Sequence, residues 1–276
     1  MKKIIYLAVF SFISLTSCAP AYFKDAKHFV KTNGDNLAVM FVSPGNNIVY
    51  TNHKPLEIKG FDTLSVSEKE IVLKENSDFL SQLDNSNVYE LFINKFLVYF
   101  TKTGLNVYTQ EFEEEFNKNE NKLIIDIAQV EFDEYYDMVR DEKEYFGKLY
   151  HNETYINAFA INIWIDYIKN NNTKLLFATN RITDYHLGWF ETGYYEGDIY
   201  YYEDNIEMKF EHIEYFLDHV AKRYAEYLYD YIMTDYVYQM QTISNTNVPD
   251  SITLHHSSGN NRIFIIGDDY KFIEIE

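Results

Sequence analysis

Cysteine and basic residues are both scarce in this sequence of 276 residues. Cys18 is the only cysteine, so no internal disulfide can form and the fold must rely on its hydrophobic core. Lys and Arg number 24 against 43 Asp and Glu, which gives a formal net charge of −19. Because affinity for nucleic acids comes largely from neutralised phosphates, this balance argues against a nucleic acid as partner.

Motifs of catalysis and cofactor binding are also missing. The sequence has no Gly-x-Ser-x-Gly, no Ser-x-x-Lys with its companion motifs and no His-Glu-x-x-His. Its 10 glycines are scattered, and none opens a helix after a predicted strand as a phosphate-binding loop requires. Acid-rich stretches such as EFEEEF (residues 111–116) are more easily explained as solvated faces than as an acid/base pair. We therefore predict a protein that is not an enzyme, with no catalytic residues and no cofactor.

Two histidine pairs leave a metal site as an alternative. His212 and His219 lie seven residues apart in a predicted helix, and His255 and His256 are adjacent in a polar stretch. Zinc favours histidines four residues apart on a helix, or further ligands from another segment. We expect the first pair to lie at the rim of an apolar helix face and the second to face solvent, so no metal site is predicted.

The first 18 residues have the pattern of an export sequence. Two lysines precede an apolar run over residues 4–15, which is shorter than the roughly 20 residues that cross a bilayer. Leu15-Thr16-Ser17-Cys18 resembles the lipobox of bacterial lipoproteins. The resemblance implies cleavage before Cys18 and acylation of Cys18, such as by palmitate, which anchors the protein to a membrane. The alternative is an ordinary signal peptide followed by a spare thiol.

The rest of the chain predicts an α+β fold. We expect a signal peptide over 1–17, a lipidated cysteine and tether over 18–35, a globular domain over 36–245 and a C-terminal hairpin extension over 246–276. Within the domain, residues 122–185 read as an antiparallel meander interrupted by a charged excursion over 133–152.

Two main helices are predicted to pack on one face of this antiparallel sheet. They span about 87–103 and 208–236, where apolar residues recur at intervals of three and four. Apolar runs over 36–44 and 46–52 predict two N-terminal strands that pair with each other. The tail alternates on both sides of residues 267–269, which predicts a hairpin there.

The element order behind the lipobox is similar to that of envelope auxiliary lipoproteins. These are the transport-auxiliary lipoproteins of lipid-trafficking systems and the lipoprotein of lipopolysaccharide assembly. The resemblance covers about residues 86–238 and implies two helices on an antiparallel sheet and a role in contacting partners. Abundant Asn, Lys, Ile and Tyr with little Arg, together with the lipobox, resemble a lipoprotein of the Bacteroidota.

An aromatic segment between the meander and the second helix is the candidate binding region. It holds eight aromatic side chains: Tyr185, Trp189, Phe190, Tyr194, Tyr195, Tyr200, Tyr201 and Tyr202. Tyr and Trp combine a large contact area with a polar group, which interfaces favour. The alternative is a β-hairpin that turns at residues 196–198, whose tyrosines pair across strands and cover the core.

Taken together, these features predict an accessory or scaffold subunit of an outer-membrane assembly, transport or secretion complex, anchored through Cys18. The expected partners are the membrane and one or more envelope proteins. The alternative function is a surface or periplasmic lipoprotein that binds a glycan or small ligand through the aromatic segment at 185–202.

Overall fold

The computed structural model describes residues 20–45, 47–54, 59–195, 197–244, 252–257, 259, 262–267 and 271–275. The predicted signal peptide and Cys18 lie outside the described residues. The chain divides into two compact units, one of residues 1–36 and 228–271 and the other of residues 37–227 and 272–276. The long helix α7 (Phe210–Ile243) contributes residues to both.

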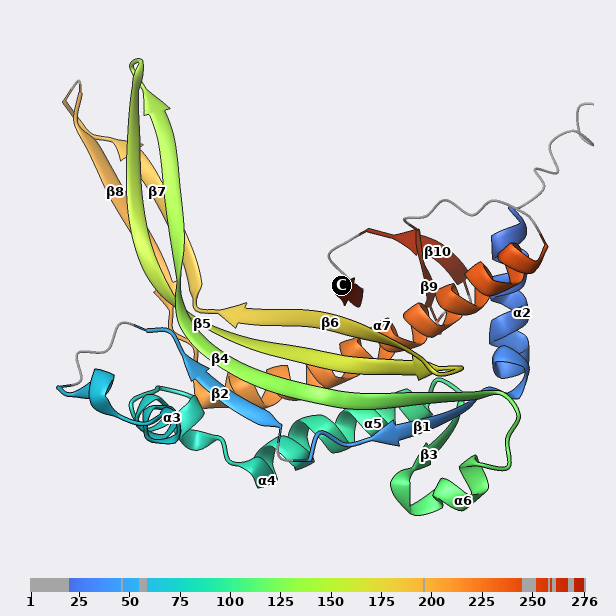
Figure 1. The fold of residues 1–276 in the computed structure, drawn as a ribbon. Coiled ribbons are helices and arrows are strands. Elements are labelled where there is room, and N and C mark those ends of the chain that lie inside the picture. The colour runs from blue at the N-terminus through green and yellow to red at the C-terminus, as the bar shows by residue number, and fades with distance from the viewer. Residues whose placement is uncertain are drawn as a thin grey trace, which may run out of the picture. The chain divides into compact units, whose positions relative to one another are not determined.

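A mixed, curled sheet forms the centre of the larger unit (Figure 1). Among the described residues it has seven strands, in the order β11-β6-β5-β4-β1-β3, with β2 also paired to β4. The strands are β1 (Ala38–Val42), β2 (Ile48–Asn52), β3 (Asn106–Thr109), β4 (Lys122–Tyr145), β5 (Lys148–Lys169), β6 (Asn172–Thr183) and β11 (Ile273–Ile275).

The prediction of a purely antiparallel sheet is only partly correct. Strands β4, β5 and β6 form the expected antiparallel meander. However, β1 runs parallel to both β3 and β4, and β2 runs parallel to β4 rather than pairing with β1. The predicted C-terminal hairpin is present, but its strands are residues 253–257 and 262–266. Its predicted turn at residues 267–269 is wrong, because β11 joins the main sheet beside β6.

A β-bulge at Ala128 changes which residues of β4 enter the core. The register passes from Ile127 opposite Ile165 to Gln129 opposite Trp164, so one residue of β4 is left over. A bulge inserts one residue and thereby reverses the alternation of side chains beyond it. The residues of β4 that are almost fully buried are accordingly odd-numbered before the bulge and even-numbered after it: Leu123, Ile125, Ile127, Val130, Phe132 and Glu134.

Helices cover one face of the sheet (Figure 1). Helical residues run without a break from α4 (Asn85–Val88) through the π-helical turn η3 (Tyr89–Ile93) to α5 (Asn94–Thr101). Shorter elements are η1 (Phe61–Thr63), α3 (Val66–Glu75), η2 (Leu80–Gln82), η4 (Gln110–Phe112) and α6 (Glu113–Phe116). Helix α7 begins at Phe210, close to the predicted start.

Aromatic side chains join this helix layer to the sheet. Phe92 of η3 contacts Phe132 of β4 and Tyr224 of α7, with ring centroids 6.1 Å apart in both pairs. The Tyr224 hydroxyl donates a hydrogen bond of 2.5 Å to the carbonyl oxygen of Ile161 in β5. The apolar stripe read from the sequence of α7 is thus buried as predicted within this unit, with Ile213, Leu217 and Val220 fully inaccessible to solvent.

Glu134 is a fully buried carboxylate at the same face of β4. It accepts hydrogen bonds from the backbone N–H groups of Asp78, Phe79 and Leu80, at 2.9, 2.9 and 3.2 Å. The buried ammonium group of Lys54 lies 2.6 Å from Oε1 of Glu134, the oxygen that also accepts from Asp78. Because these donors satisfy the carboxylate, it fixes the turn at 78–80 against the sheet instead of leaving a charge unpaired.

The predicted charged excursion over 133–152 is instead a continuation of β4 and β5. The two strands stay in register as far as Tyr145 opposite Lys148, and they turn at Phe146 and Gly147, whose φ angles of 53° and 72° are typical of a two-residue hairpin turn. The following hairpin, β7 (Tyr185–Thr192) and β8 (Ile199–Ile206), lies beside this extension. We call residues 135–157 and 185–206 the arm; it extends away from the rest of the sheet (Figure 1).

The smaller unit is helical with a hairpin. Helix α2 (Ala21–Asn36) occupies most of the segment predicted to be a tether over 18–35, and its Phe29 is fully buried against Tyr229 and Tyr236 of α7. The hairpin consists of β9 (Thr253–Ser257) and β10 (Arg262–Ile266), earlier in the chain than predicted. The tether prediction is wrong because the apolar positions of 21–32 are used by a helix that packs on α7.

Candidate functional site

The arm carries the predicted aromatic segment on the hairpin β7–β8. Trp189 pairs with Tyr202 and Phe190 with Tyr201 across the two antiparallel strands. The connecting turn is closed by a hydrogen bond of 2.7 Å from the Gly193 N–H to the Asp198 carbonyl oxygen. The sequence interpretation of this segment as a hairpin is confirmed.

One face of the hairpin exposes aromatic and aliphatic side chains together. Six residues of the two strands share this face at exposures between 39% and 58%: Tyr185, Leu187, Trp189, Tyr200, Tyr202 and Ile206. The rings of Trp189 and Tyr202 stack at 5.9 Å. Near the turn, Tyr194 and Tyr195 are 96% and 72% exposed. We call these eight residues the aromatic face.

Apart from the buried His186, the ionisable side chains that give this hairpin its charge are all acidic. Residues 185–206 contain Glu191, Glu196, Asp198, Glu203 and Asp204 but neither lysine nor arginine. Glu191 and Asp204 lie on the same side of the hairpin as Trp189, and the Trp189 indole N–H donates a hydrogen bond of 2.9 Å to the Glu191 carboxylate. The exposed side therefore combines large apolar rings with carboxylates.

The opposite face of the hairpin packs on the extension of β4 and β5. Phe190 lies against Tyr201 and Tyr150, and the Tyr145 hydroxyl donates a hydrogen bond of 2.8 Å to the Phe190 carbonyl oxygen. Phe190 and Tyr201 are thus the two members of the predicted binding set that face inward. The other six predicted residues belong to the aromatic face.

His186 is the polar centre of this inner packing. Its Nε2 lies 2.9 Å from the Asp141 carboxylate and its Nδ1 lies 2.6 Å from the Asn205 side-chain oxygen. The Tyr201 hydroxyl donates a hydrogen bond of 2.7 Å to the same Asp141 oxygen. Only 2% of the His186 side chain is exposed. Because both ring nitrogens face oxygen acceptors, no nitrogen is free to act as a base on a substrate.

The network shifts the ionisation of its members. The hydrogen bond to Asp141 raises the pKa of His186, and the bond from His186 lowers the pKa of Asp141. Burial raises the pKa of Tyr201, and its bond to Asp141 raises it further. The shifts of His186 and Asp141 favour a protonated imidazole beside an ionised carboxylate, which is the arrangement that joins the two hairpins most strongly, and the shift of Tyr201 keeps its hydroxyl a donor.

Gly188 lets the two hairpins approach closely. A Cβ atom at this position would clash with the carboxylate of Asp141 and the hydroxyl of Tyr201. The aromatic pattern of this segment did not indicate the roles of His186, Gly188 and Asp141. Asp141 lies 45 residues from His186, and no local pattern connects the two.

The histidines considered as metal ligands occur in separate surroundings. Nδ1 of His212 accepts a hydrogen bond of 3.1 Å from the backbone N–H of Lys209, whereas the His219 ring stacks on Tyr215 at 6.3 Å. His255 and His256 are not in a polar loop but in β9, where Nδ1 of His255 lies 2.6 Å from the Asp230 carboxylate. Within the described part of the chain, no three His, Cys, Asp or Glu side chains form a potential metal site.

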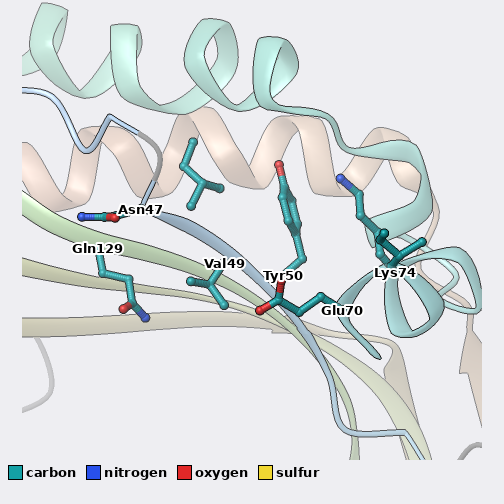
Figure 2. A pocket seen from close by; sticks show the side chains of 8 residues that line it. Asn47, Val49, Tyr50, Glu70, Lys74 and Gln129 are labelled. Carbon is teal, nitrogen blue, oxygen red and sulfur yellow. The ribbon is translucent and has the colours of Figure 1, made fainter. Parts of the chain in front are cut away.

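A second candidate site is a cavity of about 360 Å³ beside β2. Figure 2 shows Glu70 and Lys74 extending from α3 toward Tyr50 of β2. The cavity is lined by Asn47, Ile48, Val49, Tyr50, Glu70, Ile71, Lys74 and Gln129. No sequence pattern predicted this site, because its two walls come from segments that share no motif.

The cavity has one well-defined electrostatic contact. The Lys74 ammonium nitrogen lies 3.6 Å from the centre of the Tyr50 ring, and the Tyr50 hydroxyl donates a hydrogen bond of 3.0 Å to the side-chain oxygen of Asn85. Burial raises the pKa of Tyr50 to about 12 and lowers the pKa of Lys74. A cation above an aromatic face is held by the ring quadrupole.

Comparisons with protein families and with curated proteins found no match, so the site is interpreted from its geometry. No protein-family model matches the chain, and no curated protein matches its sequence. Among the helices of the described residues, none is both long and apolar enough to cross a bilayer.

Proposed function

We propose that this protein is a lipoprotein of the outer membrane, anchored through acylated Cys18, that serves as a non-catalytic accessory subunit of an envelope assembly, transport or secretion complex. The anchor rests on the lipobox at Leu15–Cys18. Confinement to a membrane raises the effective concentration of the protein for partners in the same membrane.

The observation that carries the docking role is the aromatic face of the hairpin β7–β8. Monomeric soluble proteins seldom expose a contiguous apolar surface unless it binds something. Trp189 and Tyr202 provide stacked rings near the middle of this face, which is where interfaces concentrate their binding energy. Glu191 and Asp204 add negative charge, so the partner surface that complements this face is apolar and basic.

Two further features support a binding role rather than catalysis. The His186 side chain is only 2% exposed, both of its ring nitrogens have hydrogen-bond partners, and it joins the two hairpins of the arm. The helix layer also agrees with the resemblance to auxiliary lipoproteins: the Tyr99 hydroxyl of α5 donates hydrogen bonds of 3.1 Å to Asp218 of α7 on one face of the sheet. In those families, helices on a sheet accompany a role in contacting partners.

A glycan-binding lipoprotein is the second candidate function. It is favoured by one observation: the stacked pair of Trp189 and Tyr202 beside the Glu191 carboxylate offers a ring for a sugar face and an acceptor for its hydroxyls. The indole N–H of Trp189 already donates to Glu191, which leaves one carboxylate oxygen for a ligand.

Affinity purification from membranes in mild detergent tests the docking role. Wild type is compared with Cys18→Ala, with the double variant Trp189→Ala/Tyr202→Ala and with the control Tyr215→Ala, which removes an aromatic side chain that is 74% exposed on α7. We expect wild type and Tyr215→Ala to retain the same envelope proteins, and both other variants to lose them while keeping their circular dichroism spectra.

The outcome separates the two functions. If Trp189→Ala/Tyr202→Ala retains every partner of wild type, the aromatic face is not the docking surface and the proposal fails. If wild type retains no partner but binds on a glycan array, and the double variant does not, the second function replaces the first.

A further inference from the structure

Strand β2 has a free edge beside α3. The Val130 N–H donates a hydrogen bond of 3.0 Å to the Asn47 carbonyl oxygen, and the His53 N–H donates one of 2.8 Å to the Glu134 carbonyl oxygen. In a parallel pair, alternate residues direct their backbone groups to the neighbouring strand. The odd-numbered residues of β2 therefore bond to β4, and Ile48 and Tyr50 direct their N–H and C=O groups to the other side. Among the described residues, no strand pairs with that side.

This free edge lines the cavity described above. Four consecutive residues, 47–50, form one wall, and one turn of α3 with Glu70, Ile71 and Lys74 contributes the other (Figure 2). Unpaired backbone donors and acceptors at a strand edge are the groups that an added strand would satisfy. A groove between a strand edge and a helix is a geometry in which an extended peptide binds by adding a strand.

The groove also carries separated charges. Glu70 and Lys74 are one helical turn apart, the spacing at which opposite charges usually pair. Within the described residues, no carboxylate lies within 4.0 Å of the Lys74 ammonium, which contacts the Tyr50 ring instead and feels the charge of Asp84 from further away. The Asp84 charge acts on this half-buried ammonium without forming an ion pair, and a carboxylate brought into the groove would give Lys74 a direct charged partner.

We propose that the groove between β2 and α3 binds an extended segment of a partner protein, which adds as a strand to the free edge of β2 and places an acidic side chain beside Lys74. Backbone bonds to Ile48 and Tyr50 supply the main affinity, and Lys74 selects the acidic residue. Ile71, which is 57% exposed, would be covered by a neighbouring apolar side chain of the segment. This site lies outside the arm, so its test is independent of the docking role proposed above.

Two end-blocked, fluorescein-labelled heptapeptides of alternating Thr and Val test the proposal, one with Glu and one with Gln at the centre. Fluorescence anisotropy with the full protein measures both dissociation constants. We expect the Glu peptide to bind about fivefold more tightly than the Gln peptide, the upper range for a partly exposed ion pair. In Lys74→Met this preference should fall to less than twofold, whereas the control Lys69→Met, whose nitrogen lies over the Phe61 ring, should keep it.

A second variant tests the added strand. Ile48→Pro removes the outward N–H but none of the bonds to β4, which is the position where an edge strand tolerates proline. We expect it to weaken both peptides at least tenfold without lowering the melting temperature. If Ile48→Pro does not fold, hydrogen exchange of the wild-type protein replaces this test. The Glu peptide should then protect the backbone amides of Ile48 and Tyr50 from exchange. Failure of both peptides to bind, equal binding of both, or unprotected amides would overturn the proposal.

Discussion

Replacing Glu134 by alanine tests the most completely buried charge in the larger unit. The substitution removes the acceptor for three backbone N–H groups at residues 78–80 and leaves Asp78 as the one carboxylate that the described residues place against the Lys54 ammonium. Asp78 is 63% exposed, so it compensates the buried ammonium poorly. The turn at 78–80 and the residues around Lys54 should therefore lose their attachment to β4.

The expected magnitude follows from the groups left unpaired. A buried donor without a partner costs about 1–3 kcal/mol, and breaking a buried ion pair by removing one member costs about 3–5 kcal/mol. The two costs are not added together, because the turn can relax and admit water to the unpaired N–H groups. We expect Glu134→Ala to lower the free energy of unfolding by about 3–5 kcal/mol, which is a large part of the stability of a typical domain.

Urea unfolding of the purified protein, followed by tryptophan fluorescence and circular dichroism, measures this loss. Glu134→Gln keeps the volume and one carbonyl acceptor and should lose less than Glu134→Ala. Glu142→Ala is the control, since Glu142 lies on the same strand with 45% of its side chain exposed beside Arg140; it should change the free energy of unfolding by less than about 1 kcal/mol. A loss below about 1 kcal/mol in Glu134→Ala would refute the assigned role.

Three other substitutions or conditions test the arm and the helix layer. Because the pKa of His186 is raised and that of Asp141 is lowered, their bond stabilises the arm most between about pH 4 and pH 6.5 and weakens as the pH rises through the folded pKa of His186. Amide hydrogen exchange of β7, corrected for intrinsic rates, should become faster over that rise in pH. If His186→Gln shows the same pH dependence of exchange as wild type, the assignment to His186 is wrong. Gly188→Ala should cost about 1–3 kcal/mol by overpacking the two hairpins, seen as faster proteolysis of the arm; equal cleavage rates would speak against the close packing. Tyr224→Phe should cost about 1 kcal/mol in urea unfolding because the Ile161 carbonyl loses its donor, whereas no loss would mean that water replaces the hydroxyl.

The arm illustrates where local patterns succeed and where they stop. Alternating aromatic residues and a glycine-containing turn were enough to predict the hairpin β7–β8. The same pattern does not say which face of a hairpin is covered, because both faces carry aromatic side chains. That choice depends on Asp141 and Tyr145 in β4, whose own segment was predicted to be a charged excursion.

The bulge at Ala128 shows the same limit in the core. The run from Leu123 to Val130 has apolar residues on both faces, with Asp126 on one and Gln129 on the other, so its pattern does not reveal that the alternation reverses after Ile127. The reversal coincides with the exchange of neighbours along one edge of β4, from β1 to β2, and the Asn47 side chain donates to the Ala128 carbonyl oxygen there. A change of partner strand is a long-range event that local periodicity does not encode.

Periodicity and turn residues within single short stretches were enough to predict the meander and the two main helices, and to give the hairpin of the aromatic segment as an alternative. The proposed lipid anchor likewise rests on four consecutive residues, Leu15–Cys18, which resemble a lipobox. Four features depend on tertiary contacts instead: the parallel pairing of β1 and β2, the helix α2 in the segment predicted as a tether, the buried carboxylate of Glu134 and the groove beside α3. Each of these joins residues far apart in the chain, where the free energy comes from burial and hydrogen bonds that no local pattern specifies.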